Sequence, residues 1–157
     1  MIPDHWSHAL PAIGQVDAIY PMMYDVLYVT DPDHVKEDLP ASYGGVTWMR
    51  FWPGGQVHTW WRSANEYASH PVSAADSDNF FYLGAGRYYL HGNKLIVEFV
   101  TPKNELFCPA TYFRKEGYVN SDGSITIVIK DLGGPYFLKY CPKRVGDMQR
   151  QPDWTAD

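Results

Sequence analysis

The stretch GRYYLHGNKLIVEF, residues 86–99, decides the fold. At its centre, Gly92-Asn93 is a two-residue turn with glycine where a type II′ turn requires a positive φ. This turn predicts the cross-strand pairs His91–Lys94, Leu90–Leu95, Tyr89–Ile96, Tyr88–Val97 and Arg87–Glu98. One face is then apolar, and it carries Tyr88, Leu90, Leu95, Val97 and Phe99. Because the other face is mixed and charged, we predict a hairpin from an antiparallel sheet that is wet on one side.

Composition favours strands and turns over long helices. The chain has 157 residues, of which 45% are hydrophobic and 20% charged, as is typical of one globular domain spanning 1–157. It contains 12 Tyr and 6 Trp, and aromatic side chains fit the pleated surface of a sheet. Its 12 Pro and 13 Gly indicate many turns.

Charge and hydropathy exclude some partners. The net charge is −5 and no Lys/Arg cluster is present, so we expect no nucleic-acid partner. No apolar run approaches the length that a membrane span needs, which is about 18 residues. The N-terminus has no signal-peptide pattern, so we expect a cytoplasmic protein if the chain is complete, and a secreted or periplasmic one if a signal was removed. Cys108 and Cys141 fit either one disulfide or two free thiols.

Eight strands are predicted, nearly all joined by short turns, at 22–29, 43–52, 56–61, 80–91, 94–100, 110–120, 124–130 and 136–141. We expect an irregular arm over 1–20, a polar connection over 30–40, a short helix near Ala64–Ser69 and a loosely held tail over 142–157. Sequential hairpins without helical crossovers indicate antiparallel pairing. We therefore predict an all-β protein, an antiparallel up-and-down barrel of about eight strands, with a two-sheet sandwich as the rival. Side chains fill such a barrel or leave room for one small ligand.

Three hairpins carry a resemblance to a known family. MRFWPGGQV (49–57), GRYYLHGNKLIVEFVTP (86–102) and EGYVNSDGSITIVI (116–129) follow in the order seen in small bacterial lipocalin-like (calycin) domains, over about residues 48–130. The chain differs at its first strand, where PMMYDVLYV lacks the Gly-x-Trp signature of lipocalins. The resemblance implies a closed or nearly closed barrel with a cavity, and it implies no particular ligand.

On the strand 43–52, Trp48, Arg50 and Trp52 alternate on one face and Met49 and Phe51 on the other. An Arg between two Trp could bind a carboxylate or phosphate in a pocket. The other interpretation, which we favour, has Met49 and Phe51 facing the core and Arg50 lying across exposed aromatic side chains towards solvent.

The turn NSDG, residues 120–123, leaves two registers open. A two-residue Asp122-Gly123 turn would point Arg114 and Glu116 into the barrel as a polar site. A type I turn with a glycine bulge would instead place Val119 opposite Ile125 and turn Arg114 and Glu116 outward. We favour the outward arrangement.

The candidate ligand-binding residues are Trp48, Arg50, His58, Tyr88, Tyr112 and Glu116. Seven tyrosines are spread over the three predicted strands 80–91, 110–120 and 136–141, and those that point inward could bind an aromatic ligand or simply fill the barrel. His58 could be a base, although a strand histidine more often packs or faces water.

No catalytic, metal or cofactor site is predicted. The Gly-x-Ser-x-Gly elbow is absent, and Asp4, His5 and His8 fit surface side chains better than metal ligands. Our first hypothesis is a protein that binds a small hydrophobic or aromatic molecule, which enters at the barrel end near the 62–79 connection. The second is an enzyme in the same barrel, using Arg50, His58 and Glu116 if they point inward. The third is an interaction module with a filled barrel and Trp6 and Trp60 as contact anchors, for which a homodimer is one expected assembly.

Overall fold

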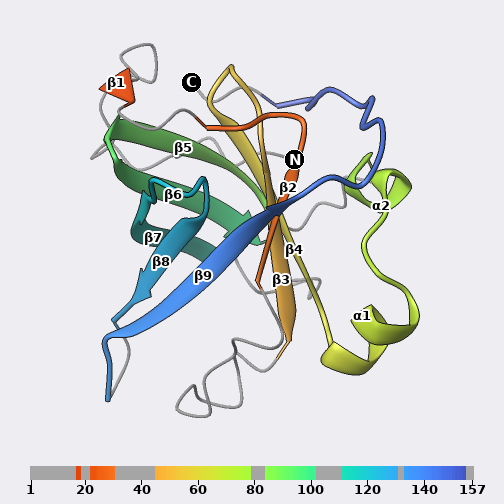
Figure 1. The fold of residues 1–157 in the computed structure, drawn as a ribbon. Coiled ribbons are helices and arrows are strands. Elements are labelled where there is room, and N and C mark those ends of the chain that lie inside the picture. The colour runs from red at the N-terminus through yellow and green to blue at the C-terminus, as the bar shows by residue number, and fades with distance from the viewer. Residues whose placement is uncertain are drawn as a thin grey trace.

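A computed structural model describes residues 17–18, 22–30, 45–78, 84–101, 111–130 and 133–154 (Figure 1). The protein is all-β, with eight antiparallel strands closed into a barrel and two short helices outside it. The strands and helices are β1 (Asp17–Ala18), β2 (Leu27–Thr30), β3 (Val46–Phe51), β4 (Gln56–Arg62), α1 (Ala64–Ser69), α2 (Ala74–Asp78), β5 (Ala85–Gly92), β6 (Lys94–Thr101), β7 (Thr111–Val119), β8 (Ile125–Ile129) and β9 (Tyr136–Lys143).

Strands β2 to β9 each pair with their neighbours in sequence, and β9 returns to β2 to close the barrel. This confirms the predicted up-and-down barrel and excludes the sandwich. The two-residue strand β1 adds to the edge of β5 in parallel, outside the cycle. The remaining predictions for the arm 1–20 and the connection 30–40 fall almost entirely outside the described residues.

The hairpin β5–β6 has the predicted register at all five pairs. Gly92 has φ +62°, the positive value that a type II′ turn requires at its first central residue. None of the described non-glycine residues, Asn93 included, has a positive φ. The turn between β7 and β8 takes the bulged form: Gly123 N–H donates to the Asn120 carbonyl over 3.0 Å, with φ +87° at Gly123. Val119 therefore faces Ile125, which is the register that we favoured.

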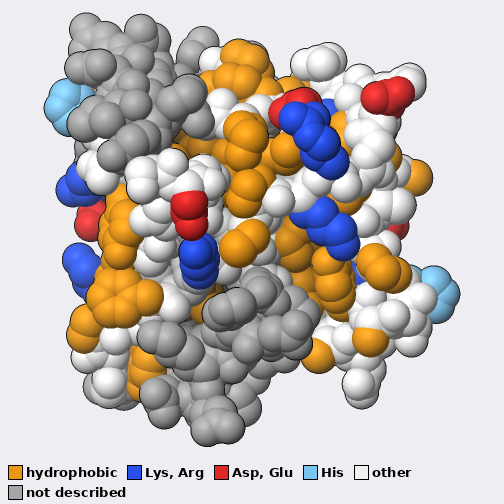
Figure 2. Space-filling view, viewed as in Figure 1, with side chains coloured by type: hydrophobic (Ala, Val, Ile, Leu, Met, Phe, Trp, Pro, Cys, Tyr) orange, Lys and Arg blue, Asp and Glu red, His pale blue; other side chains and the backbone are white. Residues whose placement is uncertain are grey.

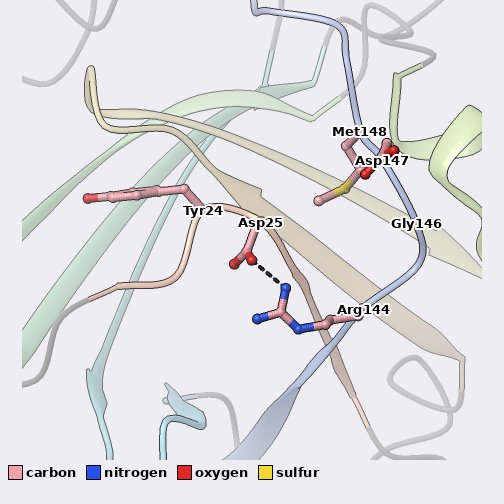
Figure 3. A pocket seen from close by; sticks show the side chains of 6 residues that line it. All are labelled: Tyr24, Asp25, Arg144, Gly146, Asp147 and Met148. Atoms are coloured by element: carbon pink, nitrogen blue, oxygen red, sulfur yellow. Dashed lines mark hydrogen bonds and ion pairs between the residues drawn. The ribbon is translucent and has the colours of Figure 1, made fainter.

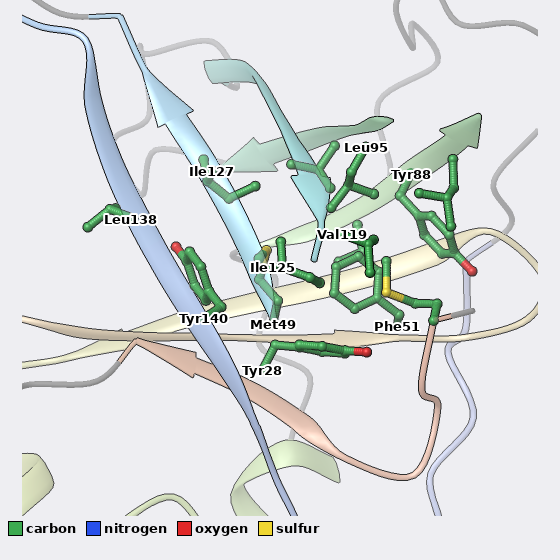
Figure 4. Packing of buried hydrophobic residues seen from close by; sticks show 14 of the residues in the cluster. Tyr28, Met49, Phe51, Tyr88, Leu95, Val119, Ile125, Ile127, Leu138 and Tyr140 are labelled. Atoms are coloured by element: carbon green, nitrogen blue, oxygen red, sulfur yellow. The ribbon is translucent and has the colours of Figure 1, made fainter. Parts of the chain in front are cut away.

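The barrel interior is packed with apolar side chains from all eight strands (Figure 4). Three large rings lie at its centre: the Phe51 ring makes edge-to-face contacts with Tyr28 at 5.5 Å and with Tyr88 at 5.0 Å between centroids. Leu90, Leu95 and Ile127 are fully buried beside them. A core of this kind is stabilised by burial of apolar surface and by close packing.

The two ends of the barrel differ. The β3–β4, β5–β6 and β7–β8 turns share one end, and residues 22–26 cross that end before β2 begins at Leu27. Met22 and Val26 join the core there, and the Met23 methyl lies 3.5 Å from where a Cβ on Gly123 would stand. The predicted strand 22–29 was therefore too long at its start, because residues 22–26 cap the barrel instead of pairing. The opposite end carries the longer connections, including 62–84.

A second layer covers the outer faces of β2, β3 and β4. Leu27, Val29, Val46 and Trp48 pack there against Val72, Tyr67 and the segment after β9. We call residues 144–154 the C-terminal strap; in Figure 1 it runs from the end of β9 past α2. The prediction of a loosely held tail was wrong, since Val145 and Met148 pack on this layer and Trp154 is buried.

The helices of this layer begin with local caps. The predicted helix Ala64–Ser69 is confirmed, with a capping box between Ser63 and Glu66. Helix α2 was not predicted, although Ser73 and Asp76 exchange hydrogen bonds in the same pattern. Among the described residues, five large apolar side chains remain exposed, namely Tyr24, Trp61, Phe113, Tyr118 and Phe137. On the face seen in Figure 2, hydrophobic side chains reach the surface in several separate places between charged ones.

Candidate functional site

The six predicted ligand-binding residues lie in different parts of the structure. Tyr88 points into the barrel, while Trp48, Arg50 and His58 come together outside it, on β3 and β4. Glu116 lies on the outer face of β7, with Arg114 at 3.6 Å and Lys130 at 3.7 Å. Tyr112 pairs with Val100 in the sheet, and its side chain lies outside the described residues. The hypothesis of an enzyme inside the barrel required Arg50, His58 and Glu116 to point inward, and all three point outward.

Arg50 is buried and does not face solvent, contrary to our expectation. Met49 and Phe51 do face the core, but α2 and the strap cover the opposite face of β3, so that Arg50 is only 3% exposed. Its Nη1 donates to Asp78 Oδ1 at 2.7 Å and lies 3.4 Å from the Ser77 carbonyl. Its guanidinium carbon sits 4.6 Å from the centre of the Trp52 ring, a cation–π contact.

Asp78 joins this arginine to the strap. Its carboxylate accepts hydrogen bonds from the backbone N–H groups of Gln149 and Arg150, both at 3.0 Å. Burial raises the pKa of Asp78, but the Gln149 N–H, the Arg50 guanidinium and the Arg150 N–H outweigh it and hold the pKa below its ordinary value. The carboxylate is therefore charged at neutral pH, opposite a charged arginine.

His58 and three tryptophans surround the same place. His58 is opposite Arg50 in the β3–β4 ladder and completely buried. Its ring lies 5.2 Å from that of Trp48 and 6.2 Å from that of Trp154, which in turn lies 5.9 Å from Trp52. Trp154 is anchored by an indole N–H to the Gly86 carbonyl, at 2.8 Å. We call Trp48, Arg50, Trp52, His58, Asp78 and Trp154 the outer cluster.

Three tyrosines meet at the capped end of the barrel. The Tyr88 hydroxyl donates to the Trp52 carbonyl at 2.7 Å and lies 3.3 Å from the Tyr24 hydroxyl, and Tyr28 accepts the Met23 N–H at 2.9 Å. Burial, then the contact with Tyr24, raises the pKa of Tyr88 far above its ordinary value. The Tyr28 and Tyr88 phenols, whose pKa values burial raises, are thus neutral hydrogen-bonding groups that fasten the 22–26 segment to the barrel.

A shallow pocket of about 350 Å³ lies beside this end, between the start of β2 and the strap (Figure 3). It is lined by Tyr24, Asp25, Arg144, Gly146, Asp147 and Met148. An ion pair between Asp25 and Arg144 crosses it. The hydrogen bond from Arg144 lowers the pKa of Asp25. Because polar and apolar groups are mixed in its lining and an ion pair crosses it, this pocket suits a purely hydrophobic ligand poorly.

The opposite end, which none of the described residues caps, presents apolar rings on the inner face of the barrel; we call it the uncapped end. Trp61 follows Val57 and Thr59 on that face and is 53% exposed; its indole lies over Gly45, at 1.9 Å from where a Cβ would stand. Phe113 is opposite the core residue Phe99 and is 44% exposed. Lys115 is next on the same face of β7, opposite Val97.

Polar groups continue from this rim into the barrel. Trp61 pairs with Thr47 on β3, Thr47 N–H donates to the Thr30 hydroxyl at 2.9 Å, and Thr30 pairs with Tyr140 on β9. Burial raises the pKa of Tyr140, so its phenol stays protonated. We call Thr30, Thr47, Trp61, Phe113 and Tyr140 the rim set.

Metal and membrane features were also sought. Within the described ranges, no three His, Cys, Asp or Glu side chains are grouped as a metal site. The proposed arm residues Asp4, His5 and His8 lie outside the described residues, as does Cys108, while Cys141 is a half-buried free thiol. None of the helices described here is long and apolar enough to cross a membrane.

Sequence reasoning missed Asp78 and Trp154, which complete the outer cluster. Asp78 lies in the stretch 62–79, which we expected to be only a connection between strands. The sequence could have indicated the burial of Trp154, because a large aromatic side chain in an otherwise polar segment usually packs against the protein.

The fold and site geometry define a closed eight-stranded antiparallel β-barrel with a covered outer face. Comparison with family models, curated proteins and solved structures finds no match to this chain.

Proposed function

We propose that the protein is a lipocalin-like barrel that binds a small hydrophobic or aromatic molecule at its uncapped end. The observation that carries the proposal is the pair of exposed rings, Trp61 and Phe113, on the inner face of that end. Water-exposed aromatic rings on a concave face favour association with an apolar ligand. The order of the three hairpins, which resembles lipocalin-like domains, supports the same class.

The rim set also supplies the polar groups that such a site uses to orient its ligand. Thr47, Thr30 and Tyr140 follow Trp61 in one cross-strand row. The Thr30 hydroxyl already bonds the Thr47 backbone and the buried Tyr140 hydroxyl bonds the Thr47 side chain, so the Thr47 hydroxyl, next to Trp61, is the polar group of this row that lies nearest to the rim. Neutral hydroxyls accept and donate hydrogen bonds without the desolvation cost of a charge. A ligand with an apolar body and one polar end therefore fits this end best.

The experiment is a fluorescence titration of the full chain with the neutral probe N-phenyl-1-naphthylamine. We expect saturable binding that is weakened about tenfold or more by Trp61→Ala and by Phe113→Ala, since each removes a large apolar contact. Phe137 provides a matched control, because it is 50% exposed but lies on the outer face, opposite Val128. Absence of saturable binding, or an equal loss in Phe137→Ala, contradicts the proposal.

Native mass spectrometry of the purified protein, compared with the denatured sample, adds an independent readout. A reproducible extra mass that is lost on denaturation supports a bound ligand and gives its mass. The same spectrum tests the proposed homodimer, as a species of twice the 18.0 kDa chain.

A further inference from the structure

Two buried hydrogen-bond donors in the outer cluster lack an acceptor. Trp48 Nε1 and Arg50 Nε are shielded from solvent, and neither finds an acceptor among the residues that the structure describes. An indole N–H and a guanidinium N–H can only donate. Buried donors in folded proteins nearly always have a partner, so an acceptor other than the described residues is expected here.

The two donors border one place. Trp48 and Arg50 are two residues apart on the same face of β3, and His58 is next to both: its ring lies 5.2 Å from Trp48, and its backbone is opposite Arg50. The strap closes this place from outside through the buried Trp154. The donors are therefore enclosed by aromatic rings, where a hydrogen bond to a charged acceptor is stronger than in water.

We propose that this enclosed place is a binding site for a small carboxylate. A carboxylate only accepts hydrogen bonds, so it matches two groups that only donate, whereas a water molecule brings two protons that also need acceptors. The guanidinium supplies the positive charge. Arg50 already shares that charge with Asp78, at 2.7 Å, which favours a monoanion over a phosphate dianion.

Asp78 couples the site to its cover. The same carboxylate holds Arg50 and the backbone N–H groups of Gln149 and Arg150 in the strap. A carboxylate that competes for Arg50 weakens one of these contacts, so entry and release involve movement of the strap. This site lies outside the barrel and does not depend on ligand binding at the rim set.

The test is a titration of the full-length protein with sodium acetate, followed by the ¹H–¹⁵N NMR signals of indole and arginine Nε–H groups. Sodium chloride at equal ionic strength is the reference. We expect saturable acetate-dependent shifts at Trp48 and Arg50, and none at the exposed Trp61. Trp48→Phe keeps a ring and Arg50→Lys keeps the charge, but each lacks one donor, so each weakens acetate binding about tenfold.

Trp61→Phe is the matched control and leaves acetate binding unchanged, which also separates this site from the rim set. The hairpin signals of residues 86–99 report whether each variant is folded. Three results overturn the proposal: equal shifts with chloride, which mean an adventitious ion only; no shift together with cross-peaks from both donors to a long-lived water; or unaltered acetate affinity in folded Trp48→Phe.

Discussion

Arg87 Nε donates to Glu98 Oε2 over 2.7 Å, across the hairpin that decides the fold, and the Glu98 side chain is completely buried. The pair was predicted as an exposed cross-strand contact on the charged face. The carboxylate has lost its water, so a substitution of Arg87 removes a cation that is in direct contact with a buried charge.

The first prediction concerns this pair. Arg87→Ala should lower the free energy of unfolding by about 3–5 kcal/mol, because Glu98 is then buried without its cation. The double variant Arg87→Met with Glu98→Leu should lose less unfolding free energy than Arg87→Ala, because it leaves no buried charge at this position. Urea unfolding followed by circular dichroism measures both. Lys130→Ala breaks an exposed pair with Glu116, outside the hairpin, and should cost less than about 1 kcal/mol; a similar loss in the two single variants would contradict the prediction.

The second prediction concerns the turn of the same hairpin. Gly92 has φ +62°, a conformation that costs a residue with a Cβ about 1–2 kcal/mol. Gly92→Ala should destabilise the protein by about that amount in urea unfolding. Gly54, in the β3–β4 turn, is the control: its φ is not positive, and an added Cβ would meet the flexible Gln56 side chain. A larger loss in Gly54→Ala than in Gly92→Ala would show that the turn geometry is not the cause.

Local signals in the sequence were sufficient for the barrel. The turn residues Gly92-Asn93 and Asn120–Gly123 specify their own backbone, and alternation then decides which side chains point inward. The short helix near Ala64–Ser69 was likewise predicted, and the structure shows that α1 begins with a capping box between Ser63 and Glu66. These features depend on neighbours only a few residues apart.

The outer cluster could not be predicted in the same way. The alternation on β3 correctly placed Arg50 outside the barrel, but what covers it comes from far along the chain. Asp78 is 28 residues away and reaches Arg50 only because α2 folds back over the sheet. Trp154 lies on Gly86 across 68 residues. Contacts between residues so far apart leave no periodic pattern in the sequence. The polar composition of residues 142–157 therefore led us to predict a loosely held tail.

The third prediction concerns acid stability. The Asp122 carboxylate accepts the Ser124 hydroxyl and the Ser124 N–H, and pairs with Lys139 at 3.1 Å; together they lower its pKa to about 2. A pKa depressed in the folded state contributes stability that is present above the unfolded value of 3.8 and is lost as the pH falls through about 2. The stability difference between the wild type and Asp122→Asn should therefore be constant above pH 3.8 and shrink towards pH 2.

Unfolding midpoints measured at a series of pH values check this, and an NMR titration of the Asp122 carboxyl gives its pKa directly. Lys139→Met should raise that pKa, because it removes one of the lowering contacts. If the stability difference between the wild type and Asp122→Asn instead grows as the pH falls, the pKa of Asp122 is not lowered in the folded state.

The last prediction concerns Trp154 as the anchor of the strap. Its ring is buried against Trp52 and His58, its indole N–H donates to Gly86, and its carbonyl accepts from the Gln56 side chain at 3.2 Å. Trp154→Phe keeps most of the ring but removes the indole donor, and should cost about 1 kcal/mol in urea unfolding. Trp154→Ala also removes the ring, and should cost about 3–5 kcal/mol if the strap and the barrel unfold together.

Hydrogen exchange at Gln149 and Arg150, whose N–H groups are held by Asp78, reports on the strap separately from the barrel. Faster exchange there in Trp154→Ala, with the hairpin 86–99 still protected, means that the strap opens over an intact barrel; unaltered exchange at both amides would show that Trp154 does not hold the strap.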